Sequence, residues 1–158
     1  MNIAERLEVV ERELAELKAA QAQEIGRVIR ANQFIVEDEN GKTRAELVIN
    51  KDGPSLSLFD KNGNPRALLS ALKDGPRLEL FDENGKPRAG LNALKDGPML
   101  SLFDENKKPR VDLCAFEDGP SLSLFDENKK PRALLSAFKD GPMLRLIDEN
   151  GKSIWSAP

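Results

Sequence analysis

The sequence predicts an all-β repeat domain, an antiparallel meander of about twelve short strands, preceded by an α-helical coiled coil. Three observations lead to this prediction. The tetrapeptide KDGP or EDGP returns every 22 residues, a second turn sequence beginning with Asp lies midway between its copies, and apolar residues at heptad spacing occupy the N-terminal segment. We therefore expect a coiled-coil oligomerisation helix over residues 1–31 and tandem β-hairpins over residues 32–158.

The first segment carries the 4, 3, 4, 3 spacing of apolar residues that defines a coiled-coil seam: Ile3, Leu7, Val10, Leu14 and Leu17. Leucine occupies the a positions, and the d positions hold Ile, Val and Leu. Leucine at a with β-branched residues at d favours three or four chains over two. A lone amphipathic helix that packs on the repeat domain is the alternative interpretation.

Each 22-residue unit predicts two strands and two turns. We expect Asn62–Gly63 to be the central pair of a two-residue turn and Asp74–Gly75 to be that of the next turn, because Asn and Gly adopt the positive φ that such turns require. With these turns, Ala71 would face Leu78 across the hairpin.

Two of the Asp turns lack the glycine, since Lys107 and Lys129 stand in its place. A two-residue turn would be strained there, so the sequence predicts a four-residue loop at both positions.

Comparison of the copies within this chain indicates which face of the sheet is buried. Leucine is invariant at three positions of the repeat, and all of them fall on one face by the period of two. We expect these leucines to form the core of an oligomer together with the heptad residues of the first segment. The predicted sheet positions are Leu56, Leu58, Leu69, Leu78, Leu80, Leu91, Leu100, Leu102, Leu113, Leu122, Leu124, Leu135, Leu144 and Leu146.

The opposite face varies between copies, and we expect it to meet water. Leu68, for example, becomes Gly90 and Asp112 in the next two units. Two features recur beside this face: a Phe at each strand end is predicted to stand across from an Arg, and the adjacent Asp could anchor that Arg. The pairs are Phe59 and Arg66, Phe81 and Arg88, Phe103 and Arg110, and Phe125 and Arg132.

Composition excludes several function classes. The chain has no His and no Tyr, a net charge of −3 and no basic block, which predicts neither an enzyme nor a nucleic-acid-binding protein. Cys114 is the single cysteine, and with no His to activate it we expect a structural thiol. The Asp turns lack the ligands of a calcium loop, so no metal site and no cofactor are predicted.

No segment is long and apolar enough to span a membrane, so no membrane partner is predicted. The opening MNIAERLE predicts a helix and no signal peptide. We therefore expect a cytoplasmic protein or part of a phage-derived particle.

A single sheet with one continuous apolar face would expose far more than the few hundred Å² tolerated on monomers. A closed twelve-stranded barrel would leave a lumen too wide for Leu and Ala to fill. The sequence therefore predicts self-association, with three sheets around one axis as a trimeric β-prism.

The repeat, in forms such as FDENGKPRAGLNALKDGPML, resembles the tandem repeats of uncharacterised bacterial proteins in which a short coiled coil precedes units of the pattern F-D-x-x-G-x-x-R-A-x-L. This resemblance covers about residues 33–155 and implies no activity. The architecture is also loosely similar to the β-rich shafts of trimeric phage fibres and adhesins. We expect a non-enzymatic structural or interaction module, and the alternative is a carbohydrate- or ion-binding module that uses the repeated outer face.

Overall fold

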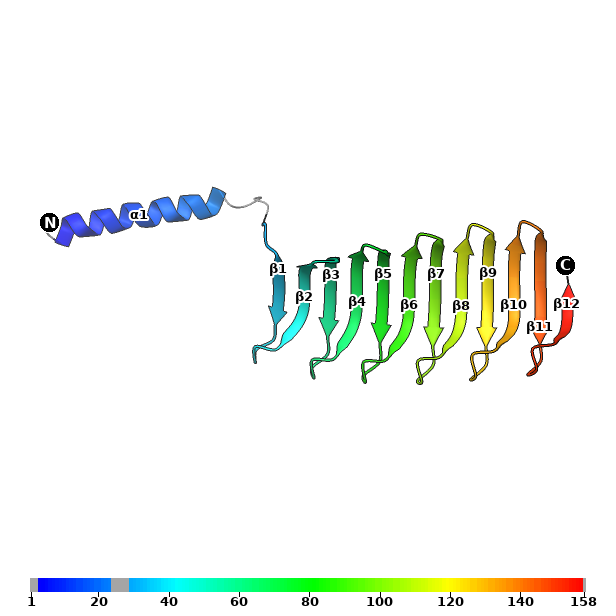
Figure 1. The fold of residues 1–158 in the computed structure, drawn as a ribbon. Coiled ribbons are helices and arrows are strands. Elements are labelled where there is room, and N and C mark those ends of the chain that lie inside the picture. The colour runs from blue at the N-terminus through cyan, green and yellow to red at the C-terminus, as the bar shows by residue number, and fades with distance from the viewer. Residues whose placement is uncertain (1–2, 24–28, 158) are drawn as a thin grey trace. The chain divides into compact units, whose positions relative to one another are not determined.

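The computed structural model describes residues 3–23 and 29–157, which form one helix and one sheet (Figure 1). Helix α1 covers Ile3–Gln23. The predicted helix extends further, but residues 29–31 are not helical, and residues 24–28 lie outside the described part of the chain. The chain separates into two compact units between Ala31 and Asn32.

The sheet is a single antiparallel meander in which each strand pairs with its neighbours in sequence, as predicted. The apolar and polar alternation of the repeat explains the strands, and the turn sequences explain their ends. The strands are β1 (Gln33–Glu37), β2 (Thr43–Asn50), β3 (Gly53–Phe59), β4 (Pro65–Leu72), β5 (Gly75–Phe81), β6 (Pro87–Leu94), β7 (Gly97–Phe103), β8 (Pro109–Phe116), β9 (Gly119–Phe125), β10 (Pro131–Phe138), β11 (Gly141–Ile147) and β12 (Ser153–Ala157).

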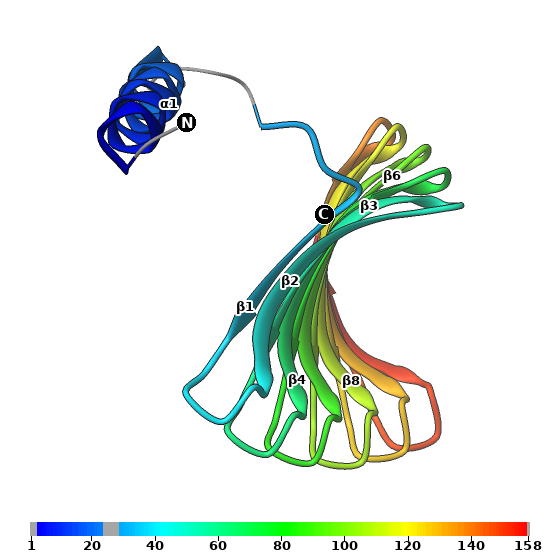
Figure 2. The same cartoon turned by 90° about the vertical axis from the view of Figure 1, so that its left-hand side faces the viewer.

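The strands are bowed, and their ends fan out progressively from β1 to β12, as expected from the twist of β-sheets (Figure 2). Within residues 32–157 no second layer covers either face of this sheet. Accordingly, the buried hydrophobic residues there are few, namely Cys114 and Ile147. The single chain therefore has strands and turns but hardly any hydrophobic core of its own.

The short turns join the strand ends along one side of the sheet, and this side runs from the first strand, β1, to the last strand, β12. We call it the turn edge. Leu72 pairs with Gly75, so the two turn residues are Lys73 and Asp74, and Ala71 faces Pro76. The predicted register, with Asp74–Gly75 at the centre of the turn, is therefore wrong by two residues. An error of two preserves the period of the strand, so the assignment of residues to faces is unchanged.

The Asp turns lie along the opposite edge, the loop edge, and have one geometry throughout the sheet. The N–H of Gly63 donates to the carbonyl of Asp60 at 3.0 Å, and the N–H of Asp60 donates to the carbonyl of Asn64 at 2.9 Å. Three residues thus form the loop, not the predicted two. Lys107 and Lys129 adopt the same geometry with φ of 61° and 63°, so the predicted four-residue loops are wrong.

The three-residue loop displaces the arginines from their predicted partners. Phe59 pairs with Pro65, because the register shifts between Leu58 and Phe59 and Arg66 becomes the extra residue of a bulge. The same shift recurs in the hairpins of Phe81, Phe103 and Phe125. The predicted pairing of each Phe with an Arg is therefore wrong by one residue.

Candidate interaction surface

One face of the sheet, which we call the leucine face, consists of three rows of side chains that run across the strands. The central row, the leucine row, is uninterrupted because each leucine pairs with the leucine of the adjacent strand. It lies at mid-strand and contains Leu47, Leu56, Leu69, Leu78, Leu91, Leu100, Leu113, Leu122, Leu135 and Leu144.

Two flanking rows carry smaller side chains on average. Near the turn edge, proline and alanine alternate, as in the pair Ala71 and Pro76. Near the loop edge, leucine alternates with alanine or valine, as in Leu58 with Ala67 and Leu102 with Val111. We call these the proline–alanine row and the alanine–leucine row.

The structure therefore places every predicted leucine of residues 56–146 on one face. Trp155 extends the alanine–leucine row, since it pairs with Leu146. The prediction omitted the prolines of this face, such as Pro76, and the first repeat, including Ala45 and Leu47, although the period of two assigns them to this face.

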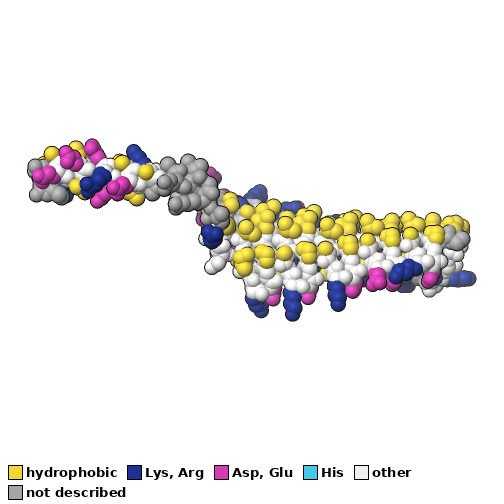
Figure 3. All heavy atoms as spheres, turned by 90° about the horizontal axis from the view of Figure 1, so that it is seen from above, with side chains coloured by type: hydrophobic (Ala, Val, Ile, Leu, Met, Phe, Trp, Pro, Cys, Tyr) yellow, Lys and Arg dark blue, Asp and Glu magenta, His cyan; other side chains and the backbone are white. Residues whose placement is uncertain are grey.

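The leucine face is open in the single chain. Nine residues of the leucine row are 37–51% exposed, and Leu122 is half-buried. A face of twelve strands at about 4.8 Å and about seven residues at 3.3 Å measures roughly 1,250 Å². That area is about twice the largest apolar patch of a typical monomer and exceeds the roughly 800 Å² per partner of a stable interface. Figure 3 shows the hydrophobic side chains as a continuous band along the sheet.

The same shallow depression recurs on this face three repeats apart. One, of about 250 Å³, is lined by Leu56, Leu69 and Pro76, among others. The equivalent one, of about 300 Å³, is lined by Leu122 and Leu135 at the corresponding positions. Equivalent positions of two repeats thus have the same surface relief.

The opposite face, which we call the serine face, is more buried than its variability predicts. Ser70 is 3% exposed, and Ser55, Ser101 and Ser136 are also buried. These side chains are small and lie between larger neighbours; for instance, the Nε of Arg77 donates to the Oγ of Ser70 at 3.3 Å. The expectation that this whole face meets water is therefore wrong for its central positions.

Cys114 lies on the serine face, where it pairs with Met99 and Ser121. It is buried, and desolvation together with the charge of Asp112 raises the pKa of its thiol. A thiol that stays protonated is a poor nucleophile. These features agree with a structural role for the side chain.

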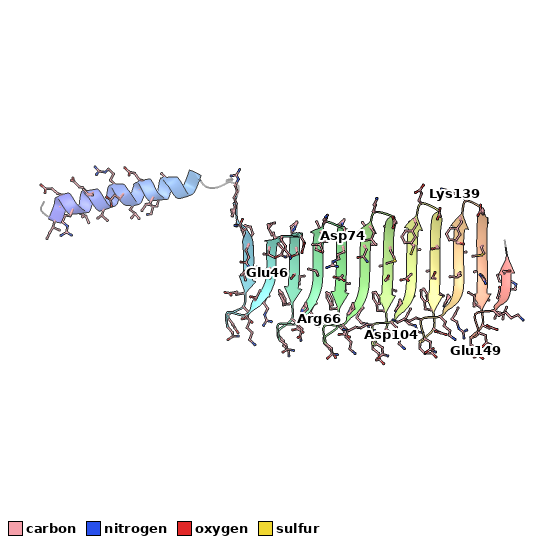
Figure 4. The ribbon with its side chains drawn as sticks, in the orientation of Figure 1. Glu46, Arg66, Asp74, Asp104, Lys139 and Glu149 are labelled. Atoms are coloured by element: carbon pink, nitrogen blue, oxygen red, sulfur yellow. The ribbon has the colours of Figure 1, made fainter. Side chains whose placement is uncertain are left out.

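Side chains link successive loops along the loop edge. The Nζ of Lys86 donates to the carbonyl of Glu105 at 2.8 Å, and the Nζ of Lys130 donates to that of Glu149 at 2.8 Å. The Nε of Arg110 likewise donates to the carbonyl of Phe125 at 3.0 Å. Each hairpin is thus fastened to the next at this edge, where Figure 4 shows Arg66, Asp104 and Glu149.

An aspartate organises each loop from within. In the fourth loop, Oδ1 of Asp104 accepts from the N–H of Asn106 at 2.8 Å and from that of Lys108 at 3.0 Å, while Oδ2 lies 3.6 Å from Nη1 of Arg110. The predicted anchoring of the arginines by Asp is thus observed. The remaining pairs are Arg44 with Asp38, Arg66 with Asp60, Arg88 with Asp82, and Arg132 with Asp126.

These contacts shift the titration of the loop aspartates. The N–H of Lys108 lowers the pKa of Asp104 most, partial desolvation opposes this effect, and the N–H of Asn106 and the guanidinium of Arg110 lower the pKa further. At Asp60, desolvation is the largest influence and raises the pKa, but the N–H groups of Asn64 and Asn62 outweigh it. The carboxylates are therefore occupied by the backbone of their own loops.

The turn edge is built differently, because glycine rather than a side chain determines its geometry. Gly75 has φ of 126°, and a Cβ on this residue would lie 2.3 Å from the carbonyl oxygen of Ala93 in the next strand. The same collision would occur at Gly53, Gly97 and Gly119. Glycine is thus required here by the neighbouring strand as well as by the backbone angle.

A cluster of metal-binding side chains and a membrane-spanning helix are both absent from the described residues. Across residues 3–23 and 29–157, no three acidic, Cys or His side chains gather so as to hold a metal ion. No helix of the described segments is both long and apolar enough to cross a membrane. The leucine face, whose central row of leucines is mostly exposed in the single chain, is the candidate functional site.

No family model matches the chain, and no curated protein does. Among solved structures, a mutant of S. aureus TarM crystallised with fondaparinux, alpha-GlcNAc-glycerol and UDP is similar over 77% of this chain, at 13% identity and a TM-score of 0.30. The chain spans 21% of the length of that protein. A likeness of this level carries no argument about fold or function.

Proposed function

We propose that this protein is a non-enzymatic structural or interaction module that assembles as a homotrimeric, rod-like β-prism. The leucine faces of three chains would form the interior, and three helices would form a parallel coiled coil. The unit would serve as a spacer or fibre-like segment whose outer surface is the serine face.

This proposal rests on how the size of the side chains on the leucine face changes from one end of each strand to the other. Leucine lies at mid-strand, and the rows on both sides contain alanine, proline or valine at half or more of their positions. Two sheets packed face to face keep a constant spacing of about 10 Å, which requires side chains of similar size along the whole of each strand. Three sheets that meet at corners leave most room at the centre of each sheet and least at its edges.

The dimensions agree with three chains. A strand of about seven residues at 3.3 Å per residue is about 23 Å long. In a prism whose triangular cross-section has sides of this length, each sheet would lie about 7 Å from the axis. A leucine from each chain would fill that space at every level. Closer packing at the corners suits the alanines and prolines.

Helix α1 provides a second, independent means of association. Its heptad residues Ile3, Leu7, Val10, Leu14 and Leu17 are 48–85% exposed in the single chain. Burial of such a seam in a parallel trimer would bring three sheets together in the same direction. The helices and the sheets would then share the same threefold symmetry.

The test is the mass of the full-length chain by light scattering, together with two aspartate substitutions. We expect three chain masses for the unchanged protein. Leu91→Asp would bury three unpaired carboxylates around the axis, at several kcal/mol each, and should dissociate or unfold the assembly.

Leu68→Asp is the matched control, because Leu68 lies on the serine face. Its equivalent Asp112 accepts a hydrogen bond from the Oγ of Ser101 at 2.6 Å, and Ser57 stands across from Leu68 in the same way. This change should cost about 1 kcal/mol or less and leave the mass at three chains. A monodisperse monomer of the unchanged protein, or greater damage from Leu68→Asp than from Leu91→Asp, would overturn the proposal.

The alternative, a carbohydrate- or ion-binding module, relied on outward arginines such as Arg88 and Arg110. In the structure these guanidinium groups are engaged with Asp82 and Asp104, and Arg110 also with the carbonyl of Phe125. No observation favours a glycan on this edge. A glycan array on the intact oligomer would revive the alternative if reproducible binding were lost in Arg110→Ala.

A further inference from the structure

Two departures from the repeat occur on opposite edges of the sheet. On the turn edge, each two-residue turn begins with lysine except the fourth, which begins with Glu117. On the loop edge, the third loop residue is glycine except in the fourth and fifth loops, where it is Lys107 and Lys129. One edge thus gains negative charge in the region where the other gains positive charge.

The two lysines occupy an unfavourable conformation. Their φ angles of 61° and 63° lie in the left-handed region. This conformation costs free energy for a residue with a Cβ, least for Asn and Asp, whereas glycine adopts it without that cost. Both side chains are exposed, and neither ammonium group makes a hydrogen bond or ion pair with the described residues of its own chain. The loop hydrogen bonds of the isolated chain hold this backbone geometry, but the two ammonium groups add no contact that would offset the strain.

Glu117 is equally without a partner in its own chain. It is exposed, and its carboxylate has no hydrogen bond or ion pair within residues 3–23 and 29–157. Strand β8, eight residues or about 26 Å long, separates it from Lys107. Charges at this separation are screened from each other at physiological salt.

The three positions nevertheless lie at neighbouring levels along the row of strands. Glu117 follows β8, Lys107 lies between β7 and β8, and Lys129 lies between β9 and β10. Measured along the row of strands, each lysine is about one strand spacing, about 4.8 Å, from the level of Glu117. The acidic turn is thus flanked by the two loops that carry the extra lysines.

We propose that the turn edge of one chain lies against the loop edge of its neighbour at each corner of the trimer, where Glu117 pairs with Lys107 and Lys129 of the neighbouring chain. This inference rests on the proposed trimer. Three identical chains with one direction around a threefold axis must bring unlike edges together at every corner, because such contacts are heterologous.

Charge complementarity supports a corner at which unlike edges meet over one at which like edges meet. If two turn edges met at the same level, Glu117 and Asp118 of one chain would lie close to the same residues of the other chain and repel them. In the threefold corner, the acidic turn meets two cations. The strain at Lys107 and Lys129 is then offset by contacts that exist only in the assembly.

The first test is a disulfide between chains. In a background of Cys114→Ser, a residue found at the equivalent positions 70 and 136, we would introduce Glu117→Cys together with Lys107→Cys. The two sulfurs cannot meet within one chain, since a disulfide requires Cα atoms within about 7 Å. Mild oxidation should give covalent species that end at three chains on a denaturing, non-reducing gel.

The matched control combines Glu117→Cys with Gly63→Cys. Gly63 holds the same loop position with φ of 85°, but its loop lies five strand spacings, about 24 Å, from the level of Glu117. This pair should remain uncrosslinked under the same conditions.

The second test exchanges the charges. Glu117→Lys should raise the dissociation constant of the trimer by about tenfold at low salt, because three corners each turn two attractive pairs into repulsive ones. Adding Lys107→Glu and Lys129→Glu to Glu117→Lys should restore assembly. High salt should diminish both effects.

The outcomes separate this inference from the proposed function. A three-chain mass without crosslinking above the control, and without rescue in the exchanged triple variant, overturns the corner contact and leaves the trimer standing. A covalent series that ends at two chains overturns the trimer and the corner together. A series that continues past three indicates an open assembly and also overturns the closed corner.

Discussion

The two edges of the sheet solve the same problem, the reversal of the chain, by different physical means. At the turn edge, glycine starts each odd-numbered strand from β3 to β11, and in all but the last of these the next strand leaves no room for a Cβ. At the loop edge, an aspartate holds the loop through two backbone N–H groups, and the glycine has nothing within 4 Å of its missing Cβ. Glycine is thus a packing requirement at one edge and a conformational preference at the other, which explains why Lys107 and Lys129 are tolerated at the second.

The substitution expected to destabilise the protein most is Gly97→Ala at the turn edge. The new methyl would lie 2.3 Å from the carbonyl oxygen of Ala115, so β8 must shift. We expect a loss of about 4 kcal/mol or more in the free energy of unfolding, measured by denaturant titration at fixed protein concentration.

Gly141→Ala is the control for that substitution. Gly141 has φ of 124°, close to the 131° of Gly97, but nothing lies within 4 Å of its missing Cβ. It should cost about 1–3 kcal/mol, from the backbone angle alone. Equal losses at the two positions would show that the neighbouring carbonyl is not the cause.

Acid should weaken the loop edge selectively. The pKa values of Asp38, Asp60, Asp82, Asp104 and Asp126 are lowered in the folded chain below the ordinary value of 3.8. Because the folded state holds these protons less tightly than the unfolded state, the stabilisation is fully present above about pH 4 and is lost as the pH falls through the lower folded values.

Thermal melts between pH 5 and pH 2 would test this prediction. The melting temperature should decline mainly below pH 4, and Asp104→Asn should make the decline smaller, because the amide oxygen still accepts the backbone hydrogen bonds without titrating. A melting temperature that is constant down to pH 2 would contradict the role of the carboxylates.

The smallest effect is expected from a large residue at the loop edge. Gly85→Lys introduces a whole side chain at φ of 70° where nothing lies within 4 Å. It should cost about 1–2 kcal/mol, the strain of the left-handed conformation. A lysine at Gly85 should therefore be less damaging than a methyl group at Gly97, and the reverse order in denaturant titrations would refute the distinction between the edges.

Much of the fold was predictable because its determinants are local. The 22-residue period, the alternation of side chains and the turn residues together define twelve antiparallel strands and place every predicted leucine on one face. The candidate surface followed from the same pattern, except for its prolines and its first repeat. The heptad of the first segment predicted helix α1 but not its end, which comes before residue 29.

The errors have a common physical origin. Propensity assigned Gly63 and Gly75 to the same kind of turn, since both follow a residue that favours turns. The structure shows that Gly75 opens a strand and makes space for the carbonyl of Ala93, whereas Gly63 completes a three-residue loop. A contact with the neighbouring strand determines the geometry at Gly75, and sequence periodicity does not report such contacts.

The sequence by itself determined the number of strands, their order and the side of the sheet on which each side chain lies, because these depend on residues a few positions apart. Only the tertiary structure decided the register at the turn edge, the bulges at the arginines and the burial of the serines. Each of these depends on atoms of an adjacent strand: a carbonyl beside Gly75, a backbone oxygen that accepts from Arg66, and larger side chains around Ser70.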